Sequence, residues 1–330
     1  MVSVIIPNYN HSQYLAQRID SVLAQSYQSI ELILLDDCST DNSREIIEQF
    51  RGHEKVSHIV YNEQNSGSTF KQWQKGITLA KGNFVWIAES DDWAETDFLS
   101  EVMFLFEKDV SLSYISTDSF IVDAVGHKIA RGYSHDCFTN KSLVGYRVHK
   151  GADFVANHLF VNCVISNASA VVFKKDLASD LLQASQQFKL AGDWLFWVKI
   201  AQKGNVGIIH NSLNNFRVHQ ATVRNTMKAQ LQVQEYYKVL KYITENFELT
   251  NQQKSKAFSF NSIDVFRLKR EGKLTFSFLL KSYFETVYKF DFGFLFRIFK
   301  LYFLDKLYFS VFILKAIKNK ILKCVYNINC

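Results

Sequence analysis

The chain has 330 residues, of which 48% are hydrophobic and 21% charged, and this balance excludes an intrinsically disordered protein. Its net charge of +6 arises in one segment, because residues 281–323 hold nine Lys or Arg against three acidic residues. The other residues are balanced in charge, which points away from a nucleic-acid groove across the main domain and toward a tail that contacts an anionic partner. The five cysteines lie far apart without a CxxC pair, so we expect neither a zinc site nor a disulfide framework, and a reducing cytoplasm fits.

The first hundred residues alternate strand and helix patterns. Strands are predicted at 2–6, 31–35, 56–61 and 84–88, and helices at about 15–23, 41–51 and 69–81. No basic or apolar leader precedes the first strand, so we expect no cleaved signal peptide. The alternation predicts an α/β fold with a mostly parallel sheet, helices on both faces, and ligands at the carboxyl ends of the strands.

The rest of the chain divides into a mixed part and a helical part. Strands are predicted at 112–117, 168–173 and 205–210, with a helix at about 192–203. Long helical patterns begin near 226, and Phe, Tyr and Lys become frequent from 274. We therefore predict a main domain over 1–225 and a helical region over 226–330.

One predicted strand, in "LILLDDCSTDNS", ends in the adjacent acids Asp36 and Asp37. A solvated turn that begins a helix, with Ser39 or Asp41 as the N-cap, is the simple interpretation. The alternative is a ligand site at the strand end.

A second strand, in "IAESDDWA", ends in Glu89, Asp91 and Asp92. A helix start with Asp91 or Asp92 near the N-cap is again the simple interpretation. Oxygen-rich clusters also suit Mg²⁺ or Mn²⁺. A nucleoside diphosphate at one strand end and a metal at the other would explain both acidic ends together.

Several motifs in order resemble family 2 glycosyltransferases, a large inverting group with the GT-A (nucleotide-diphospho-sugar transferase-like) fold. The segments that carry the resemblance are "VSVIIPNYNHSQYLAQRIDSVLAQSY", "LILLDDCSTDNS" and "NSGSTFKQWQKGITLAKGNFVWIAESDDW". It covers about residues 1–225 and leaves the tail outside. The resemblance implies transfer of a sugar from a nucleotide sugar, with Mn²⁺ or Mg²⁺ as cofactor.

The resemblance also implies roles for the polar residues at the first two strand ends. Pro7, Asn8 and Tyr9 would line the nucleotide pocket. Asp37, with Asp36 beside it, would bind the base or position the ribose.

The same resemblance implies which residues would bind the metal. Glu89 and Asp91 occupy the two acidic places of the DxD motif, and Asp92 follows them. The segment "NNFRVHQATV" resembles a late family segment that folds back over the diphosphate, which makes Arg217 a donor-binding candidate and His219 a metal or phosphate ligand. We expect Asp91 and His219 to hold the metal, and Glu89 and Asp92 to face the donor.

Asp193 is the candidate for the base. It lies in "LAGDWLFWVKIAQKGN", which resembles the family's acidic-aromatic segment, although an Asp at a helix start also caps for ordinary reasons. Trp194 and Trp197 could form an acceptor platform or pack in the core. Lys71 and Lys75 could contact phosphate or lie on a solvated helix face.

Three positions depart from the family pattern. Cys38 stands where the family usually has Gly, Glu89 where it usually has Asp, and Gly192 where Glu usually precedes the base. None of these changes removes an essential charge. Because Glu89 is longer than Asp, we expect it to contact the ribose of the donor instead of the metal. The missing acid at Gly192 would affect binding of the acceptor and not the role of Asp193.

The tail combines aromatic rings with the basic surplus. No apolar run reaches the length that a membrane-spanning helix needs. Lys and Arg beside Phe and Tyr favour an interfacial helix on anionic lipid at the inner face of the plasma membrane. A helical cap packed on the main domain is an equal alternative.

The sequence thus predicts a cytoplasmic inverting glycosyltransferase. It would move a sugar, with a UDP-sugar as the first candidate donor, to a hydroxyl of a glycan or lipid-linked acceptor in bacterial surface polysaccharide synthesis. Two alternatives stay open. One is a nucleotidyltransferase, which would normally show a Gly-rich basic loop after the first strand, and the other is a catalytically impaired nucleotide-sugar binding protein, for which Gly192 is the best argument.

Overall fold

The computed structural model describes residues 1–132, 145–165, 167–178, 181–219 and 228–305. The chain divides into two compact units. One is Met1–Met227 with Glu245–Glu248, and the other is Lys228–Thr244 with Leu249–Cys330.

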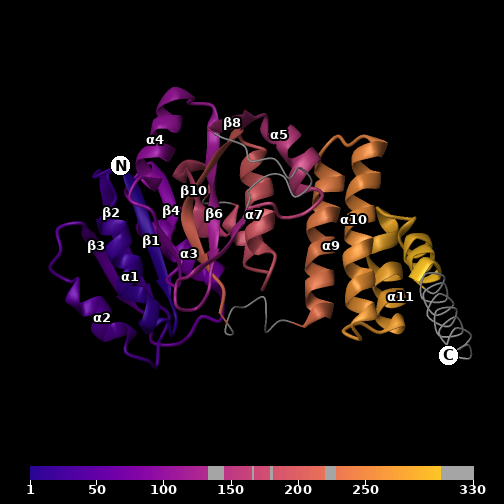
Figure 1. Ribbon diagram of the computed structural model, residues 1–330, viewed down its shortest axis with the longest axis horizontal. Coiled ribbons are helices and arrows are strands. Elements are labelled where there is room, and N and C mark those ends of the chain that lie inside the picture. The colour runs from indigo at the N-terminus through magenta and orange to yellow at the C-terminus, as the bar shows by residue number, and fades with distance from the viewer. Residues whose placement is uncertain (133–144, 166, 179–180, 220–227, 306–330) are drawn as a thin grey trace, which may run out of the picture. The chain divides into compact units, whose positions relative to one another are not determined.

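The first unit begins with four parallel strands in the order β3-β2-β1-β4 (Figure 1). The predicted strands and helices of this part are confirmed. The strands are β1 (Val2–Asn8), β2 (Ile30–Asp36), β3 (Val56–Tyr61) and β4 (Phe84–Ile87). The helices between them are α1 (Ser12–Leu23), α2 (Ser43–Gln49) and α3 (Thr69–Leu79). Strands in this order bring their carboxyl ends to one edge of the sheet.

Beyond β4 the sheet becomes mixed and continues in the order β9-β6-β10-β5. Strand β9 is antiparallel to both β4 and β6, whereas β6 and β10 are parallel. These strands are β5 (Trp93–Ala94), β6 (Leu112–Val122), β9 (Val171–Lys174) and β10 (Asn205–Arg217), with β7 (Lys128–Gly132) and β8 (Tyr146–His149) paired outside this path. The strand predicted at 168–173 starts later, because Ala168–Ala170 form a 3₁₀ turn.

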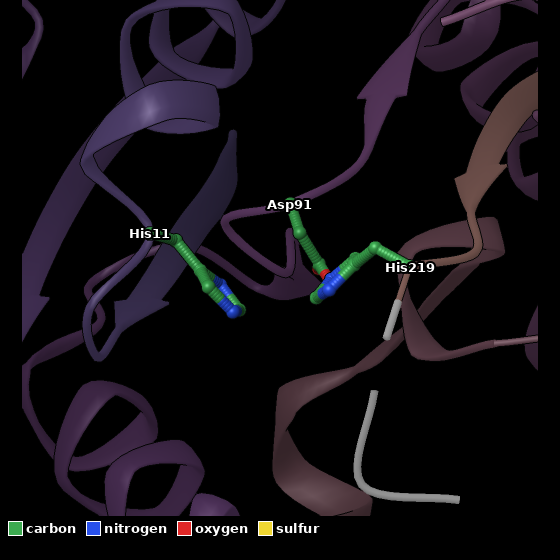
Figure 2. Close-up of side chains that lie close together, drawn as sticks. All are labelled: His11, Asp91 and His219. Atoms are coloured by element: carbon green, nitrogen blue, oxygen red, sulfur yellow. The ribbon is translucent and has the colours of Figure 1, made fainter. Parts of the chain in front are cut away.

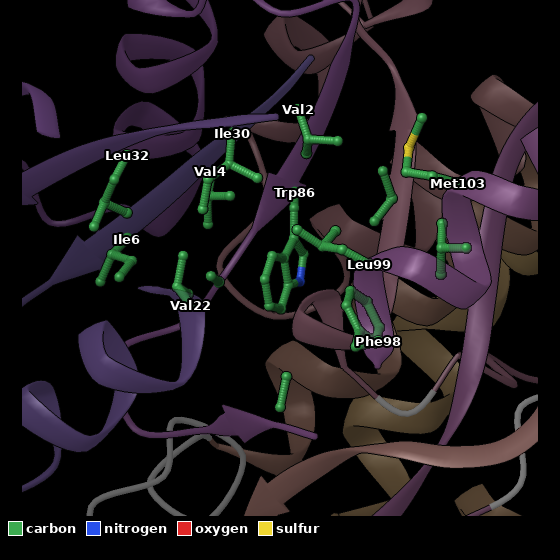
Figure 3. Packing of buried hydrophobic residues seen from close by; sticks show 14 of the residues in the cluster. Val2, Val4, Ile6, Val22, Ile30, Leu32, Trp86, Phe98, Leu99 and Met103 are labelled. Atoms are coloured by element: carbon green, nitrogen blue, oxygen red, sulfur yellow. The ribbon is translucent and has the colours of Figure 1, made fainter. Parts of the chain in front are cut away.

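Helices cover both faces of the sheet. On one face, Val22 of α1 and Phe98 of α4 (Phe98–Lys108) belong to one hydrophobic cluster with Val2, Val4 and Ile6 of β1 (Figure 3), which also includes Ile47 of α2. On the other face, α3 approaches so closely that a Cβ atom at Gly76 would stand 2.4 Å from Ile5 Cγ2. The remaining elements of this unit are Gly151–Phe154 (α5), Val155–Leu159 (a π-helical turn), Lys175–Leu177 (3₁₀), Leu182–Ser185 (α6) and Gly192–Ala201 (α7).

The simple interpretation of each acidic strand end was a helix start, and the structure contradicts the predicted residues in both cases. Helix α2 has Asn42 as its N-cap, so neither Ser39 nor Asp41 is the cap. Asp41 still accepts hydrogen bonds from the backbone of Ser43 (3.0 Å) and of Ser12 (2.9 Å), which joins the starts of α2 and α1. The turn of Glu89–Asp92 leads into the short strand β5, so the prediction of a helix start there is wrong.

The second unit is helical in the part that the structure describes. It contains α9 (Ala229–Asn246) up to Thr244, α10 (Asn251–Arg270), α11 (Phe276–Glu285) and the 3₁₀ turn Val287–Lys289, and residues 294–305 are helical. Thr250 and Gln253 form a reciprocal capping box at the start of α10. Among the described helices, none has the length and apolarity needed to cross a membrane.

Candidate active site

The ends of β1 and β2 are joined by their polar side chains. Asn8 and Asp36 are paired in register, and Asn8 Nδ2 donates to Asp36 Oδ1 at 3.0 Å. The other oxygen of Asp36 accepts from the backbone N–H of Ser39 (3.0 Å) and from Arg44 Nε (3.3 Å). Asp36 is buried, and these donors offset its charge. Pro7 lies buried within β1, whereas Tyr9 is 46% exposed just beyond the strand.

Asp37 turns to different neighbours from those of Asp36, which explains how two adjacent acids coexist. Its Oδ1 accepts from Asn62 Nδ2 (2.6 Å), the backbone N–H of Ser66 (2.9 Å) and Gln72 Nε2 (2.9 Å). Its Oδ2 accepts from Ser66 Oγ at 2.7 Å. Asp37 therefore fixes the loop between β3 and α3 against the strand end.

The two lysines of α3 lie beside this loop. Lys71 is exposed, and its Nζ donates to the backbone carbonyl of Ser66 at 3.3 Å. Lys75 Nζ donates to Asn62 Oδ1. Both ammonium groups therefore lie next to residues that hold Asp37.

Glu89 and Asp92 are held by the protein on opposite sides of their turn. Trp73 Nε1 donates to Glu89 Oε1 at 2.9 Å. Asp92 is 2% exposed and accepts from the backbone N–H of Arg217 (2.9 Å) and from Asn167 Nδ2. Burial raises the pKa of Glu89 to about 8 and that of Asp92 to about 7. The carboxylate of Asp92 thus fixes β10 to this turn.

A buried guanidinium that the sequence analysis missed lies within the electrostatic reach of this cluster. Arg18 is fully buried in α1, its Cζ lies 4.7 Å from the ring centroid of Trp86, and its nitrogens have no hydrogen-bond partner among the described residues. Burial lowers the pKa of Arg18 to about 10, against the opposing effect of Asp92, Glu89 and Asp91. Arg18 stays charged and offsets the acids. Its place on the apolar stripe of α1, between Leu15 and Ile19, is the sequence signal that could have identified it.

The carboxylate of Asp91 lies close to the imidazole rings of His11 and His219. His219 follows β10, and its Nε2 lies 3.0 Å from Asp91 Oδ2. His11, just after β1, reaches toward the same place, and one ligand atom from each of the three residues lies within 4.8 Å of the others (Figure 2). All three are only partly buried. Burial lowers the pKa of His11, which favours its neutral form. Burial alone would raise the pKa of Asp91, but the hydrogen bond from His219 and the nearby imidazoles hold it below its usual value.

Arg217 connects several segments of the site through hydrogen bonds of its guanidinium. Its guanidinium donates to the backbone carbonyls of Asp91 (2.8 Å) and Ala124 (2.9 Å) and to Gln17 Oε1 (2.7 Å). It also lies over the rings of Tyr14 and Trp93, with its Cζ 4.4 and 4.7 Å from their centroids. Arg217 is 2% exposed, so its guanidinium faces the protein, and it holds the backbone carbonyl of Asp91 in place.

Asp193 lies in the first turn of α7 and is half-buried. Its Oδ1 accepts from the backbone N–H of Trp194 at 2.7 Å, and the N-cap is Ala191, so Asp193 is not the capping residue. Trp194 and Trp197 are 1% and 0% exposed, so the acceptor-platform prediction is wrong for both rings and core packing is confirmed.

A sheet covered on both faces, with carboxylates and imidazoles at the ends of its strands, places this unit in the GT-A class of nucleotide-diphospho-sugar transferase-like folds. Residues 3–154 match the model of glycosyl transferase family 2. The resemblance found in the sequence is thereby confirmed.

One relative is TuaG of Bacillus subtilis (strain 168), a glycosyltransferase assigned to teichuronic acid biosynthesis. It is 36% identical over 115 residues, which are 34% of this chain and 45% of the relative. The chain thus spans less than half of that relative's length.

Two solved structures share the fold. Residues 1–349 of S. aureus TarS in complex with UDP-GlcNAc superpose with a TM-score of 0.59 at 18% identity, covering 81% of this chain and 72% of that one. The mannosyltransferase PcManGT from Pyrobaculum calidifontis, in complex with GDP-Man and Mn²⁺, gives a TM-score of 0.53 at 14% identity, covering 79% and 70%.

Proposed function

We propose that this protein is a metal-dependent inverting glycosyltransferase that uses a nucleotide sugar, with a UDP-sugar as the first candidate. Its acceptor would be a hydroxyl of a glycan or lipid-linked glycan in the assembly of a bacterial surface polysaccharide. The observation that carries the proposal is the contact of Asp91 with His219, made at the same sheet edge as Asn8 and Asp36. The family match, the TuaG relationship and the UDP-GlcNAc complex of TarS support it.

The donor set at Asp91 fits a divalent metal. A carboxylate oxygen and imidazole nitrogens are ligands that Mn²⁺ accepts, and the half-buried position leaves access for an ion. Asp91 and His219 would hold the ion, which when bound supplies Lewis-acid neutralisation of the leaving diphosphate. The Mn²⁺ complex of PcManGT supports this part of the proposal.

The nucleotide end would be formed by the first two strands. Tyr9 is exposed beyond β1 and offers a ring on which a base could stack. Asn8, Asp36 and Asp37 fix the strand ends and the loop beside them, with Pro7 anchoring Asn8 within β1. Lys71 is exposed next to this loop and would reach phosphate or ribose oxygens from α3.

Asp193 would act as the general base. It lies half-buried in the first turn of α7, and a carboxylate there can accept a proton. The acceptor oxygen attacks the anomeric carbon while the bond to the diphosphate breaks, and the hydroxyl proton passes to Asp193. A single displacement of this kind inverts the anomeric configuration.

The second unit would attach the enzyme to an anionic membrane surface. Large side chains of 276–304 lie exposed in a short stretch of chain, with Lys281, Lys289 and Lys300 also exposed among them. The exposed large side chains are Phe276, Phe284, Tyr288, Phe292, Phe296, Phe299, Tyr302, Phe303 and Leu304. Aromatic rings with neighbouring cations suit the headgroup region of a bilayer. The rest of the predicted tail, 306–323, lies outside the described residues.

A donor panel tests the function. The full chain with Mn²⁺ is incubated with UDP-, GDP- and TDP-sugars, with and without glycan acceptors, and released nucleotide and glycosylated product are measured. Release of UDP with product formation supports the proposal. Release of the sugar 1-phosphate, with the nucleotidyl group transferred to the acceptor, would indicate a nucleotidyltransferase, and nucleotide binding without turnover would indicate an impaired binding protein.

A further inference from the structure

We infer that His11 is a third protein ligand of the metal and that the pair His11 and His219 gives the site a preference for Mn²⁺ over Mg²⁺. The inference rests on the proposed function for the identity of the site, but the test below does not depend on turnover. His11 comes from the segment after β1, far in sequence from both other ligands.

Geometry supports His11 as a ligand. Its ring lies at 90° to that of His219 with their centroids 5.6 Å apart, and both rings converge on Asp91 (Figure 2). Nδ1 of His11 is already engaged by Ser90 Oγ at 2.8 Å, which leaves Nε2 for the ion. An imidazole with one nitrogen held by a neighbour and the other toward a cation is the usual arrangement at metal sites.

The turn that contains Ser90 and Asp91 positions two of the proposed ligands, His11 and Asp91. Ser90 orients His11, and the next residue, Asp91, supplies the carboxylate. The backbone carbonyl of Asp91 is held in turn by Arg217 Nε at 2.8 Å. One short turn after β4 therefore sets the positions of two ligands from different parts of the chain.

Two imidazoles with one carboxylate form a softer donor set than carboxylates alone. Mg²⁺ prefers oxygen ligands and retains its water, whereas imidazole suits first-row transition metals. The structure thus predicts that replacing His11 by a carboxylate shifts the site toward Mg²⁺. Of the neighbouring acids, both carboxylate oxygens of Asp92 accept hydrogen bonds, from Asn167 and the backbone of Arg217, and one oxygen of Glu89 accepts from Trp73.

The test measures Mn²⁺ binding to the full chain by electron paramagnetic resonance, alone and with UDP, and Mg²⁺ competition against it. His11→Ala should weaken Mn²⁺ binding at least about tenfold, since even an outer-shell partner is worth about 10- to 100-fold. His11→Asp should retain binding but let Mg²⁺ compete better. His53→Ala, an exposed histidine away from the trio, should behave as the wild type.

Pulsed spectra of the bound Mn²⁺ separate ligation from a structural role. Coupling to two imidazole nitrogens is expected in the wild type and to one in His11→Ala, with thermal unfolding as the check on folding. Equal Mn²⁺ affinity and unchanged nitrogen coupling in His11→Ala would overturn the inference, as would a wild type that binds no Mn²⁺. His11-dependent binding without any sugar transfer would instead overturn the proposed function and leave this inference standing.

Discussion

Gly192 packs directly against the ring of Phe70. A Cβ atom at Gly192 would stand 2.5 Å from Phe70 Cε2 and 2.8 Å from the backbone carbonyl oxygen of Ser185. The position before Asp193 therefore has no room for any side chain in this protein. The absence of the expected glutamate follows from packing between α3 and α7, and it is not by itself a sign of lost catalysis.

Gly192→Ala should lower the free energy of unfolding by about 1 to 3 kcal/mol, the usual cost of overpacking. Urea unfolding of the full chain measures it. Phe70→Leu should recover part of the loss in the double variant, because the backbone of Ser185 still opposes the new methyl group. Gly52→Ala is the control, since nothing lies within 4 Å of its Cβ position. Additive effects of the two substitutions would contradict the packing argument.

Cys38 adopts a left-handed backbone conformation with φ of 62°, which fits the family's preference for Gly there. Cys38→Gly should raise the free energy of unfolding by up to about 1 kcal/mol, because relief of the Cβ strain exceeds the added entropy of the unfolded chain. Thermal unfolding checks this. Cys38→Ala keeps a Cβ atom and should give no gain, and a gain equal to that of Gly would refute the backbone explanation.

Asp193→Asn should reduce sugar transfer by about 10²- to 10⁴-fold, because the amide cannot accept the acceptor proton. Nucleotide affinity, measured by calorimetry with UDP, should stay nearly unchanged. Asp97→Asn, at an exposed position before α4, serves as the matched control. Normal turnover of Asp193→Asn would remove it as the base.

Removal of the metal should stop transfer. EDTA should abolish product formation and added Mn²⁺ should restore it, and Asp91→Ala should cost at least about a hundredfold in rate, since Lewis-acid assistance is worth several kcal/mol. Full activity in excess EDTA would mean that protein cations stabilise the leaving group. Arg217 is already bound to protein carbonyls, so Lys71 and Lys75 would then be examined first.

The exposed aromatic residues of the second unit should hold the chain on anionic vesicles. The full chain should cosediment with vesicles of anionic lipid, less with neutral ones, and dissociate only partly at high salt, because buried rings add a part that salt does not remove. Replacing Phe292 and Phe296 together by Ser should weaken binding about tenfold or more. Phe104→Ser, at a 50% exposed site on α4, is the control. Absence of vesicle binding by the full chain would favour the packed-cap alternative.

The sequence by itself determined the elements and the polar strand ends. Strand and helix periods are local, so the runs at 2–6 and 31–35 and the helices between the first four strands could be located from spacing alone. The position of Asp36, Asp91 and Asp193 at the ends of their elements followed from the same local pattern. The clustered acids indicated a metal and a diphosphate from their chemistry, and the resemblance to a family added the sugar-transfer reaction and the role of Asp193 as base.

Tertiary structure decided which polar groups meet. His219 reaches Asp91 because β10 returns antiparallel to β5, with Asn215 paired to Trp93, and no local pattern encodes that pairing. His11 was missed because its two partners lie 80 and 208 positions away along the chain. The burial of Trp194 and Trp197 and the fit of Gly192 against Phe70 depend on how α7 packs on α3 and the sheet. Periodicity follows from backbone geometry, whereas these contacts follow from the close packing of segments distant in sequence.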